Sequence, residues 1–406
     1  MADFKQHGPI TTLHRLPGGS LEKIEDELRA LSKTRPMSLI LPSLFSELEG
    51  EALPGILEQL SGADYINEII IGLDQANEEQ FKHAQEFFSV LPQTKKILWN
   101  DGPRLQKIAK ELQELDLTPD QPGKGRNVWY CMGYILARNT SKAIALHDCD
   151  ILTYSRDIPA RLFYPIVNPA LDFEFCKGYY ARVNSKGSLS GRVTRLFVDP
   201  MLRALKKTLG HTEYLDYLDA FRYPLSGEFS MNMNMLSSMR IPSDWGLEIG
   251  ILSEAYRNTS MRRVCQVDIV DNYDHKHQDV GNDNHEEGLS KMSYEITKAL
   301  FRKIGTQGLP MNKAFFRAVK ATYLREALDV LESYSADAHI NGLNIDIHAE
   351  EKMIELFSSS IIHAGEIYQK KPMEKPFIPN WRRVYSAVPD LTERLLEAVE
   401  LDNSDR

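Results

Sequence analysis

Two aspartates separated by a single residue, Asp148 and Asp150, bring carboxylate oxygens together at one point of the chain. Carboxylate oxygens are ligands that Mg²⁺ and Mn²⁺ prefer, and an ion held there would neutralise a diphosphate. His275 and His277 are further candidate metal ligands, because imidazole suits Mn²⁺ better than Mg²⁺. Each group also has a plain interpretation, namely a solvated turn for the aspartates and a histidine-rich surface loop for the histidines. A metal site is therefore predicted only if the fold brings the two groups to one place.

Glycines next to basic residues form two candidate anion sites. The segment 122–125, Pro-Gly-Lys-Gly, leads into a helical pattern, so a phosphate could meet a helix N-terminus and the Lys124 ammonium. The segment lacks the spacing of a Walker A motif, and a flexible glycine turn with a surface lysine is the alternative. Farther along, Gly191, Arg192 and Thr194 offer a backbone approach, a planar guanidinium and a hydroxyl, which suit a phosphate or a carboxylate. The alternative there is a basic, solvated helix face.

Two glutamates in apolar surroundings, Glu228 and Glu248, could each bind a sugar hydroxyl. Trp245 lies close to Glu248 in the sequence, and an indole ring suits the apolar face of a sugar. A buried carboxylate that only supports the structure through hydrogen bonds is an equally good interpretation of either glutamate. The sequence contains no serine-hydrolase elbow, no H-E-x-x-H helix and no G-x-G-x-x-G loop.

The motifs can act together only if the chain folds around them. Short β-rich runs alternate with helical patterns, which indicates βαβ units and an α/β fold with a mostly parallel sheet. The runs lie at residues 38–41, 66–73, 95–99, 142–148, 173–183 and 262–270, and helical patterns separate the first four at 78–90, 103–115 and 128–139. Such sheets bind ligands at the carboxyl ends of their strands, which is where Ser43 and Asp148 stand.

The two ends of the chain differ from this central region. Residues 1–19 are polar and contain several prolines and glycines, which suggests a loosely held arm, and an amphipathic helix follows as far as Pro36. Residues 301–406 carry long helical patterns and a proline-rich bridge at 370–381. We therefore expect a helical C-terminal extension.

The composition of the chain is that of an ordinary globular protein: 406 residues, 42% of them hydrophobic and 26% charged. A formal net charge of −9 argues against a general nucleic-acid binder, which needs concentrated lysine and arginine. The four cysteines form no C-x-x-C pair, so neither a disulfide framework nor a zinc site is indicated. The first residues lack the apolar core of a signal peptide, and no uncharged apolar run reaches the roughly 18 residues of a membrane span. We expect a cytoplasmic protein without nucleic-acid or membrane partners.

Taken in order, the motifs resemble those of the glucosyl-3-phosphoglycerate synthases, which are retaining glycosyltransferases of the GT-A type. The shared strings are LPSL at 41–44, PGKG at 122–125, DCD at 148–150, KGYYAR at 177–182, GRVT at 191–194, PLSGE at 224–228 and WGLEIG at 245–250. A histidine after the next strand completes the set. The resemblance covers about residues 37–300 and implies a Rossmann-like nucleotide-sugar-binding domain. Its donor half would span about 37–150 and its acceptor half about 151–300, with an N-terminal arm and helix at 1–36 and the helical extension at 301–406.

The resemblance also implies an activity. Enzymes of this family move glucose from UDP-glucose to 3-phosphoglycerate with retention, toward the compatible solute glucosylglycerate, and use Mg²⁺ or Mn²⁺. By matching motif, the implied residues are Pro42, Ser43 and Leu44 for uridine, Lys124 and Asp148 for the rest of the donor, Asp150 and His275 for the metal, Gly191, Arg192, Thr194 and His277 for the acceptor, and Trp245 and Glu248 for the transferred sugar. The Leu225 carbonyl would stabilise the transition state, and Glu248 and Asp150 would share in catalysis. Small-molecule substrates and a second copy of the chain in a homodimer are the implied partners.

The chain departs from the family pattern in the implied nucleotide pocket. The usual Asn-Glu after LPSL is replaced by Phe45-Ser46, and the usual Asp-Ser-Gly-Ser by the segment 73–76, Leu-Asp-Gln-Ala. A mannosyl transferase using GDP-mannose, or an enzyme with another phosphorylated acceptor, is therefore the nearest alternative. A nucleotidyltransferase and a non-catalytic nucleotide-binding protein are more distant ones.

Overall fold

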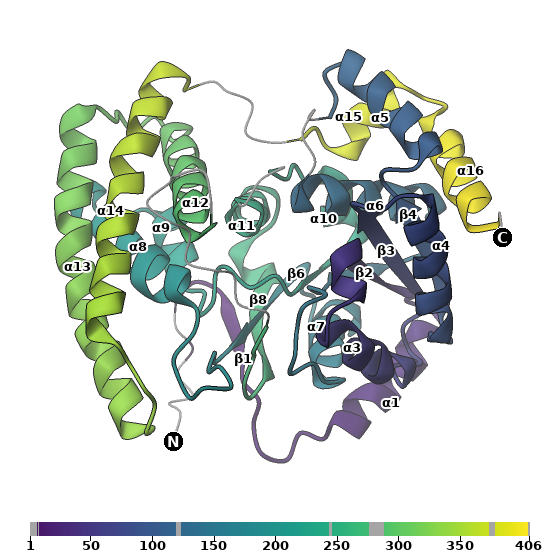
Figure 1. Cartoon of the computed structure of the whole chain (residues 1–406), viewed down its shortest axis with the longest axis horizontal. Coiled ribbons are helices and arrows are strands. Elements are labelled where there is room, and N and C mark those ends of the chain that lie inside the picture. Colours follow the sequence, from purple (N-terminus) through teal and green to yellow (C-terminus); the bar gives the residue numbers. More distant parts are fainter. Residues whose placement is uncertain are drawn as a thin grey trace.

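One continuous sheet of eight strands runs through the molecule, which is known from a computed structural model (Figure 1). The structure describes residues 6, 8–118, 123–242, 246–275, 288–372 and 378–404. In spatial order the strands are β1 (Thr11–Leu13), β8 (Val264–Val270), β6 (Phe175–Tyr180), β7 (Phe229–Asn232), β5 (Ala143–Leu146), β2 (Met37–Leu44), β3 (Glu68–Asp74) and β4 (Thr94–Trp99). Neighbouring strands are parallel except at β7, which runs antiparallel to both β5 and β6.

The central strands are buried on both faces, as their uninterrupted apolar sequences require. β3 is buried along its whole length, because helices cover both sides of the sheet there. Ile40 of β2 pairs with Ile70 of β3 on one side and with Leu146 of β5 on the other. This register places the residues that follow β2 next to those that follow β5, where the sequence predicts a ligand site.

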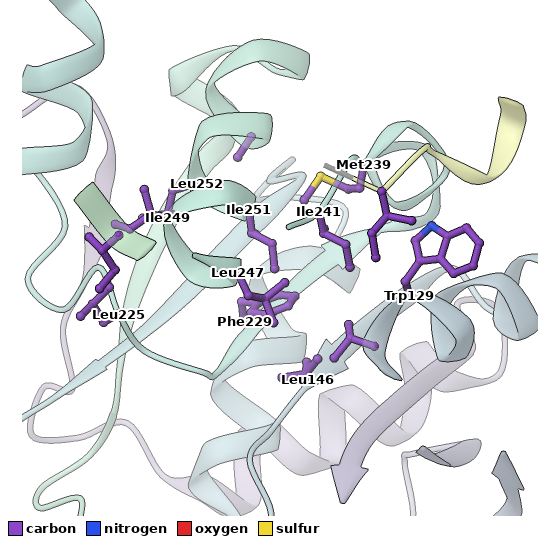
Figure 2. Packing of buried hydrophobic residues seen from close by; sticks show 14 of the residues in the cluster. Trp129, Leu146, Leu225, Phe229, Met239, Ile241, Leu247, Ile249, Ile251 and Leu252 are labelled. Carbon is purple, nitrogen blue, oxygen red and sulfur yellow. The ribbon is translucent and has the colours of Figure 1, made fainter. Parts of the chain in front are cut away.

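Two layers of helices enclose the sheet. One face is covered by α1 (Leu21–Ser32), α2 (Phe45–Leu48), α3 (Ala52–Ser61), α4 (Glu78–Phe87) with a short turn η1 (Phe88–Val90), and α7 (Asp157–Val167). The other face carries α5 (Pro103–Glu114), α6 (Lys124–Arg138), α8 (Asp199–Leu209), α9 (Glu213–Asp219), α10 (Met233–Ser238) and α11 (Leu247–Asn258). Part of this second core, around Leu146, Phe229 and Leu247, is shown in Figure 2.

The C-terminal helices divide between the two sides of the molecule. α12 (Gly288–Gly305), α13 (Lys313–Ile340) and α14 (Ile347–Lys370) form a bundle against α8, at the left of Figure 1. α15 (Trp381–Ala387) and α16 (Leu391–Ser404) return to the opposite side and pack near α6 and β4. No helix in the described part of the chain is long and apolar enough to cross a membrane.

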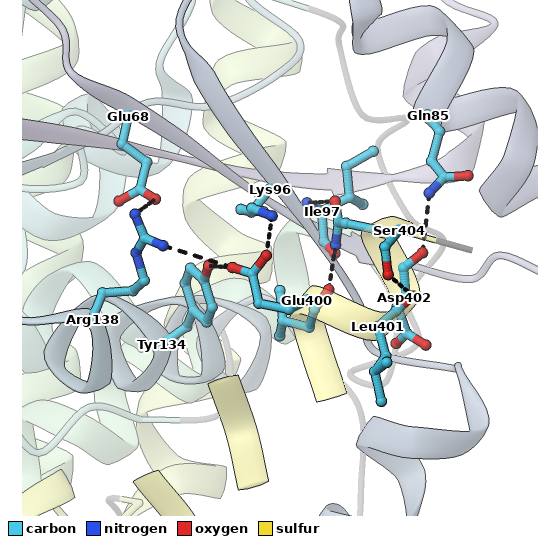
Figure 3. Close-up of polar contacts among 12 residues, drawn as sticks. Glu68, Gln85, Lys96, Ile97, Tyr134, Arg138, Glu400, Leu401, Asp402 and Ser404 are labelled. Atoms are coloured by element: carbon cyan, nitrogen blue, oxygen red, sulfur yellow. Dashed lines mark hydrogen bonds and ion pairs between the residues drawn. The ribbon is translucent and has the colours of Figure 1, made fainter. Parts of the chain in front are cut away.

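Helix α16 covers the edge of the sheet at β4. The Asn403 amide accepts from the Ile97 backbone N–H and donates to the Ile97 carbonyl, as a neighbouring strand would. Glu400 of the same helix binds Lys96 and accepts a hydrogen bond from Tyr134 (Figure 3). These contacts satisfy strand groups that would otherwise offer a template for pairing with other chains.

Helix α15 is joined to α6 by two stacked tryptophans. The Trp129 and Trp381 rings lie 4.1 Å apart between centroids, and each indole N–H donates to a carbonyl of the opposite segment, at Pro379 and Trp129 respectively. A Cβ atom at Gly133 would collide with the Trp381 ring, so glycine is required where the two helices meet.

The structure corrects the sequence-based assignment of some elements. Residues 1–19 were expected to form a loose arm, but Thr11–Leu13 form β1, an edge strand paired with β8. Strand β7 was not predicted, because its four residues are too few to show a period. A π-helical segment η2 (Val193–Val198) runs directly into α8, so that α8 begins at Asp199 without a separate N-cap turn. A last short turn, η3 (Met261–Arg263), precedes β8.

Candidate active site

A cavity of about 380 Å³ opens beside the end of β5, between α6, α11 and the loop before η2. Most of the residues predicted to act together line it: Lys124, Asp148, Asp150, Gly191, Arg192, Thr194, Leu225, Glu248 and His275. The two candidate anion sites and the candidate metal ligands therefore share one space, although they lie far apart in the sequence.

The first residue of α6 carries the central cation of the cavity. Lys124 Nζ lies 2.6 Å from Asp148 Oδ1, after β5, and 3.2 Å from Glu248 Oε1, in the first turn of α11. Burial alone would lower the pKa of Lys124, but the two carboxylates outweigh it and raise that pKa. Burial opposes the negative charge of Asp148 in the same way. The Lys124 ammonium nevertheless holds the pKa of Asp148 below its usual value. Lys124 and Asp148 are thus both charged at neutral pH.

Asp150 and His275 approach each other at the rim of the same cavity. His275 Nδ1 lies 3.6 Å from Asp150 Oδ2, and a backbone bridge joins Ile151 to His275. Burial and the neighbouring Asp148 raise the pKa of Asp150 to about 7, so a further positive charge would stabilise its ionised form. Within the described residues, no group of three or more His, Cys, Asp or Glu side chains is placed to hold a metal. A carboxylate with an imidazole fits Mg²⁺ or Mn²⁺ that takes its other ligands from a diphosphate and water.

Glu228 is a structural carboxylate and not an open ligand. It is fully buried and accepts hydrogen bonds from the Ser226, Tyr180 and Tyr273 hydroxyls at 2.9, 2.8 and 2.7 Å. Burial, with the nearby Asp148, raises its pKa. Of the two glutamates that the sequence offered for a sugar hydroxyl, only Glu248 lines the cavity.

The second anion group, Gly191, Arg192 and Thr194, lines the wall of the same cavity that is formed by residues 188–194. Gly191 has φ +75°, a left-handed conformation that favours glycine, and it precedes the π-helical turn η2. Arg192 lines the cavity with a side chain that is 35% exposed, and its Nε donates to Glu350 Oε1 of α14 at 2.7 Å. The Thr194 hydroxyl is buried and has no hydrogen-bond partner among the described residues. This wall thus offers donors to an anion.

Leu225 lines the cavity from the turn before β7. It belongs to the same buried apolar cluster as Leu247 and Ile249 of α11, part of which is shown in Figure 2. Two residues later, a Cβ atom at Gly227 would collide with the Asp148 carboxylate. Glycine is therefore required there, a constraint that the sequence alone does not show.

The predicted uridine residues, expected to follow a strand that ends at residue 41, are instead the last three residues of β2, outside the cavity lining. Ser43 is buried and donates to the Leu44 carbonyl, whereas Leu44 is partly exposed. In the altered segment 73–76, Asp74 is the last residue of β3, is buried and accepts a hydrogen bond from Asn100 Nδ2 at 2.7 Å, and Gln75 has φ +59°. Pro42 pairs with Gly72 of β3. Trp245 and His277 lie outside the described residues.

Several cavity residues were not assigned a role from the sequence. Arg182 donates to the Tyr223 hydroxyl at 3.0 Å, and its guanidinium lies over the Tyr273 ring. Tyr273 stacks on Tyr180 with ring centroids 3.9 Å apart, so aromatic rings form one side of the cavity. Arg182 stands in the string KGYYAR, which the sequence shares with the family that it resembles, and that string was the signal that could have identified it.

Comparison with individual known proteins places the chain in a family, although no family model matches it. A glucosyl-3-phosphoglycerate synthase from Persephonella marina is 48% identical over 405 residues and is covered completely, as is this chain. One from Methanococcoides burtonii is 40% identical, with 98% of each chain covered. A crystal structure of the Mycobacterium tuberculosis enzyme with Mn²⁺, UDP-glucose and phosphoglyceric acid has the same fold, with a TM-score of 0.53 at 22% identity over 73% of this chain and 88% of that one.

These comparisons confirm the fold class and the family that the sequence motifs predicted. The relatives match the full length of the chain and include the C-terminal region that lay outside the motif-based resemblance. The protein belongs to the family of glucosyl-3-phosphoglycerate synthases, which are glycosyltransferases.

Proposed function

We propose that this enzyme transfers glucose from UDP-glucose to 3-phosphoglycerate and forms glucosyl-3-phosphoglycerate. The observation that carries the proposal is that Lys124, Asp148 and Asp150 line the same cavity as the anion group of Gly191 and Arg192. A sugar nucleotide and a phosphorylated acid are both anions, and they need separate cationic groups at a short distance from each other. The names of the full-length relatives support the same pair of substrates.

On the donor side, Asp150 and His275 would hold Mg²⁺ or Mn²⁺. When bound, the ion supplies positive charge to the diphosphate and to the UDP leaving group. Lys124 adds a second positive charge, and its pairing with Asp148 and Glu248 fixes the position of the ammonium in the cavity. Pro42, Ser43 and Leu44 would line the uridine. Trp245 and Glu248 would contact the glucose.

On the acceptor side, Gly191, Arg192 and Thr194 would bind the phosphate or carboxylate of 3-phosphoglycerate. The guanidinium can donate two parallel hydrogen bonds to such a group, and the Thr194 hydroxyl, which has no partner among the residues that the structure describes, supplies another donor. His277 would add a further contact. The acceptor hydroxyl would then point toward the sugar that Glu248 and Leu225 face.

We propose that transfer proceeds with retention. Of the cavity carboxylates in the described part of the chain, Asp148 and Glu248 are paired with Lys124, and Asp150 faces His275. None of these is left as an uncommitted general base of the kind that inversion uses. The Leu225 backbone carbonyl would instead stabilise positive charge that develops on the sugar.

The experiment is turnover of purified enzyme with UDP-glucose, GDP-glucose and GDP-mannose, each with 3-phosphoglycerate and Mg²⁺. We expect release of UDP and a product whose anomeric proton has the small coupling of an α-glucoside in NMR. A β-linked product would overturn retention, and a clear preference for GDP-mannose would overturn the assigned donor. Release of pyrophosphate would indicate a nucleotidyltransferase, and binding of UDP without turnover would indicate a non-catalytic protein.

We also propose a cytoplasmic homodimer organised as a donor half, an acceptor half and a helical extension, with the boundaries given above. The four cysteines are buried thiols, which suits a reducing compartment. Light scattering of the purified enzyme tests the dimer, and a monomer at micromolar concentration would contradict it.

A further inference from the structure

Glu350, in the first turn of α14, contacts the acceptor site from the C-terminal bundle. Its carboxylate is only 4% exposed and binds two arginines, namely Arg192, which lines the cavity, and Arg195 of η2. Oε1 accepts from Arg192 Nε at 2.7 Å, and Oε2 accepts from Arg195 Nη2 at 2.9 Å. One carboxylate of α14 therefore holds the side chain of Arg195, in η2, and that of Arg192, the residue just before η2. Both arginines stand about 155 positions earlier in the chain.

Arg195 extends this contact to the backbone of the acceptor loop. Its Nε donates to the Ser190 carbonyl at 2.9 Å, and Nη2 also approaches the Leu189 carbonyl at 3.2 Å. Arg195 is buried, and its guanidinium lies over the Tyr334 ring of α13. The loop before Gly191 is thus fixed by Arg195, and Arg195 is fixed by α13 and α14.

The contact also determines which part of Arg192 faces the cavity. Glu350 occupies the Nε donor, and the two terminal nitrogens have no hydrogen-bond partner among the described residues. A guanidinium has five N–H donors in a rigid plane, so fixing Nε fixes the direction of the remaining four. The terminal fork is the part that can bind a carboxylate or phosphate with two parallel hydrogen bonds.

We propose that Glu350 is a positioning residue for the acceptor: it orients Arg192 and the loop of residues 189–191 so that they bind the anionic groups of 3-phosphoglycerate. This inference rests on the proposed function, because it takes Arg192 as an acceptor ligand. It assigns a part of the acceptor site to the C-terminal helices, which the sequence suggested only as an extension.

Two physical effects of Glu350 on an anionic acceptor oppose each other. Its negative charge lowers the positive potential of the wall, so removing the charge alone would tighten acceptor binding. Its geometry orients the guanidinium before the acceptor arrives, so removing the contact leaves Arg192 to be ordered during binding. We expect the geometric effect to dominate, because the carboxylate is buried and binds both arginines directly.

The test compares Glu350→Gln, Glu350→Asp and Glu350→Ala with Glu351→Gln in the full-length enzyme. Glu351→Gln makes the same charge change one residue along α14, on its exposed side. The amide of Gln can serve only one arginine as acceptor, and Asp keeps the charge but is one methylene too short for both contacts. We expect the acceptor KM to rise about tenfold for Gln and Asp and further for Ala, with the UDP-glucose KM unchanged within twofold.

Calorimetric titration of 3-phosphoglycerate into the enzyme with UDP and Mg²⁺ gives a readout that does not depend on turnover. Tighter acceptor binding in the Gln and Ala variants, or variants that match Glu351→Gln, would overturn the inference. An equal loss for donor and acceptor would also overturn it, because that pattern means general loss of structure. If the Ala variant does not fold, the near-isosteric Gln variant and the Asp variant decide the question.

The failure of this inference can be told from a failure of the proposed function through Arg192→Ala. If that variant keeps a normal acceptor KM, the proposed acceptor site is wrong. If it loses acceptor affinity while the three Glu350 variants do not, the site stands and only the role of Glu350 is wrong.

Discussion

The Lys124 ammonium lies 2.6 Å from the Asp148 carboxylate, across the gap between the start of α6 and the end of β5. The pair joins the two motifs that the sequence offered separately for phosphate and metal binding. Because Gly227 leaves no side chain above Asp148, the carboxylate remains accessible from the cavity.

Lys124→Met should weaken the use of UDP-glucose. The substitution removes a positive charge from the diphosphate site and leaves two partly buried carboxylates without their partner. We expect kcat/KM for UDP-glucose to fall by roughly ten- to a hundredfold, as for the loss of a charge-assisted hydrogen bond of about 1.5 to 3 kcal/mol. Steady-state kinetics measures this, with Lys82→Met, at an exposed ion pair of α4, as the control. Normal donor kinetics in Lys124→Met would refute the assignment.

Asp150→Asn should weaken binding of the divalent ion. An amide keeps the size of the side chain but removes the negative charge that a metal ligand supplies. We expect most turnover to be lost and Mn²⁺ affinity, measured by titration in the presence of UDP, to fall by at least tenfold. Full activity in EDTA, or an Asp150→Asn enzyme with unchanged Mn²⁺ affinity, would remove the proposed metal site.

Arg192→Ala should affect the acceptor and spare the donor. The loss of a bidentate contact predicts a roughly ten- to a hundredfold fall in kcat/KM for 3-phosphoglycerate. Arg192→Lys should recover only part of it, because an ammonium cannot reproduce the planar fork. Initial rates with each substrate varied in turn check this prediction. Complete recovery by lysine would mean that charge alone is recognised.

Lys177→Met should stabilise the fold at neutral pH. Lys177 of β6 is buried, and its ammonium has no hydrogen-bond partner among the described residues. Burial lowers its pKa to about 8, although the Glu248 and Glu228 carboxylates act in the opposite direction. Between this value and the ordinary 10.5, the unfolded chain binds more protons, so this lysine makes stability rise with pH in that window. Below about pH 8 the cost of the buried charge is fully present.

Thermal unfolding of Lys177→Met and of the parent chain at pH 7 and pH 10 measures this effect. The gain in Tm should be clear at pH 7 and should shrink as the pH rises from 8 toward 10.5. Lys352→Met, on the exposed side of α14, serves as the control and should show no such trend. A gain that is equal at both pH values would show that packing, and not charge, explains the difference.

Much of the candidate site could be predicted because its residues directly follow strands. Asp148 comes after an apolar run that has to be a buried strand, and in a parallel sheet that position alone places it at the ligand-binding edge. The location of Lys124 at the start of α6 can be predicted in a similar way, because Gly123 and Gly125 stand ahead of apolar residues that recur at helical spacing. In both cases local sequence determines the element, and the element determines where the side chain lies.

The contribution of Glu350 could not be predicted in this way. Glu350, Glu351 and Glu355 all stand in one amphipathic helix, and their local sequence gives no reason to single out the first. Only the packing of α14 against η2 makes Glu350 buried. The need for glycine at position 227 likewise depends on Asp148, which is distant in the sequence. Such constraints arise between elements, where a single sequence carries no signal.

The stacked pair of Trp129 and Trp381 has a consequence for how the chain reaches its native state. Helix α6 carries Lys124 at one end and is held near its middle by a segment that follows it by about 250 residues. Contacts between residues so distant in sequence form late and slow the search for the native state, since a long loop must close first. Until residues 378–387 dock, the face of α6 that carries Trp129 is exposed. A fragment that ends near residue 300 would expose it permanently and should be prone to aggregation.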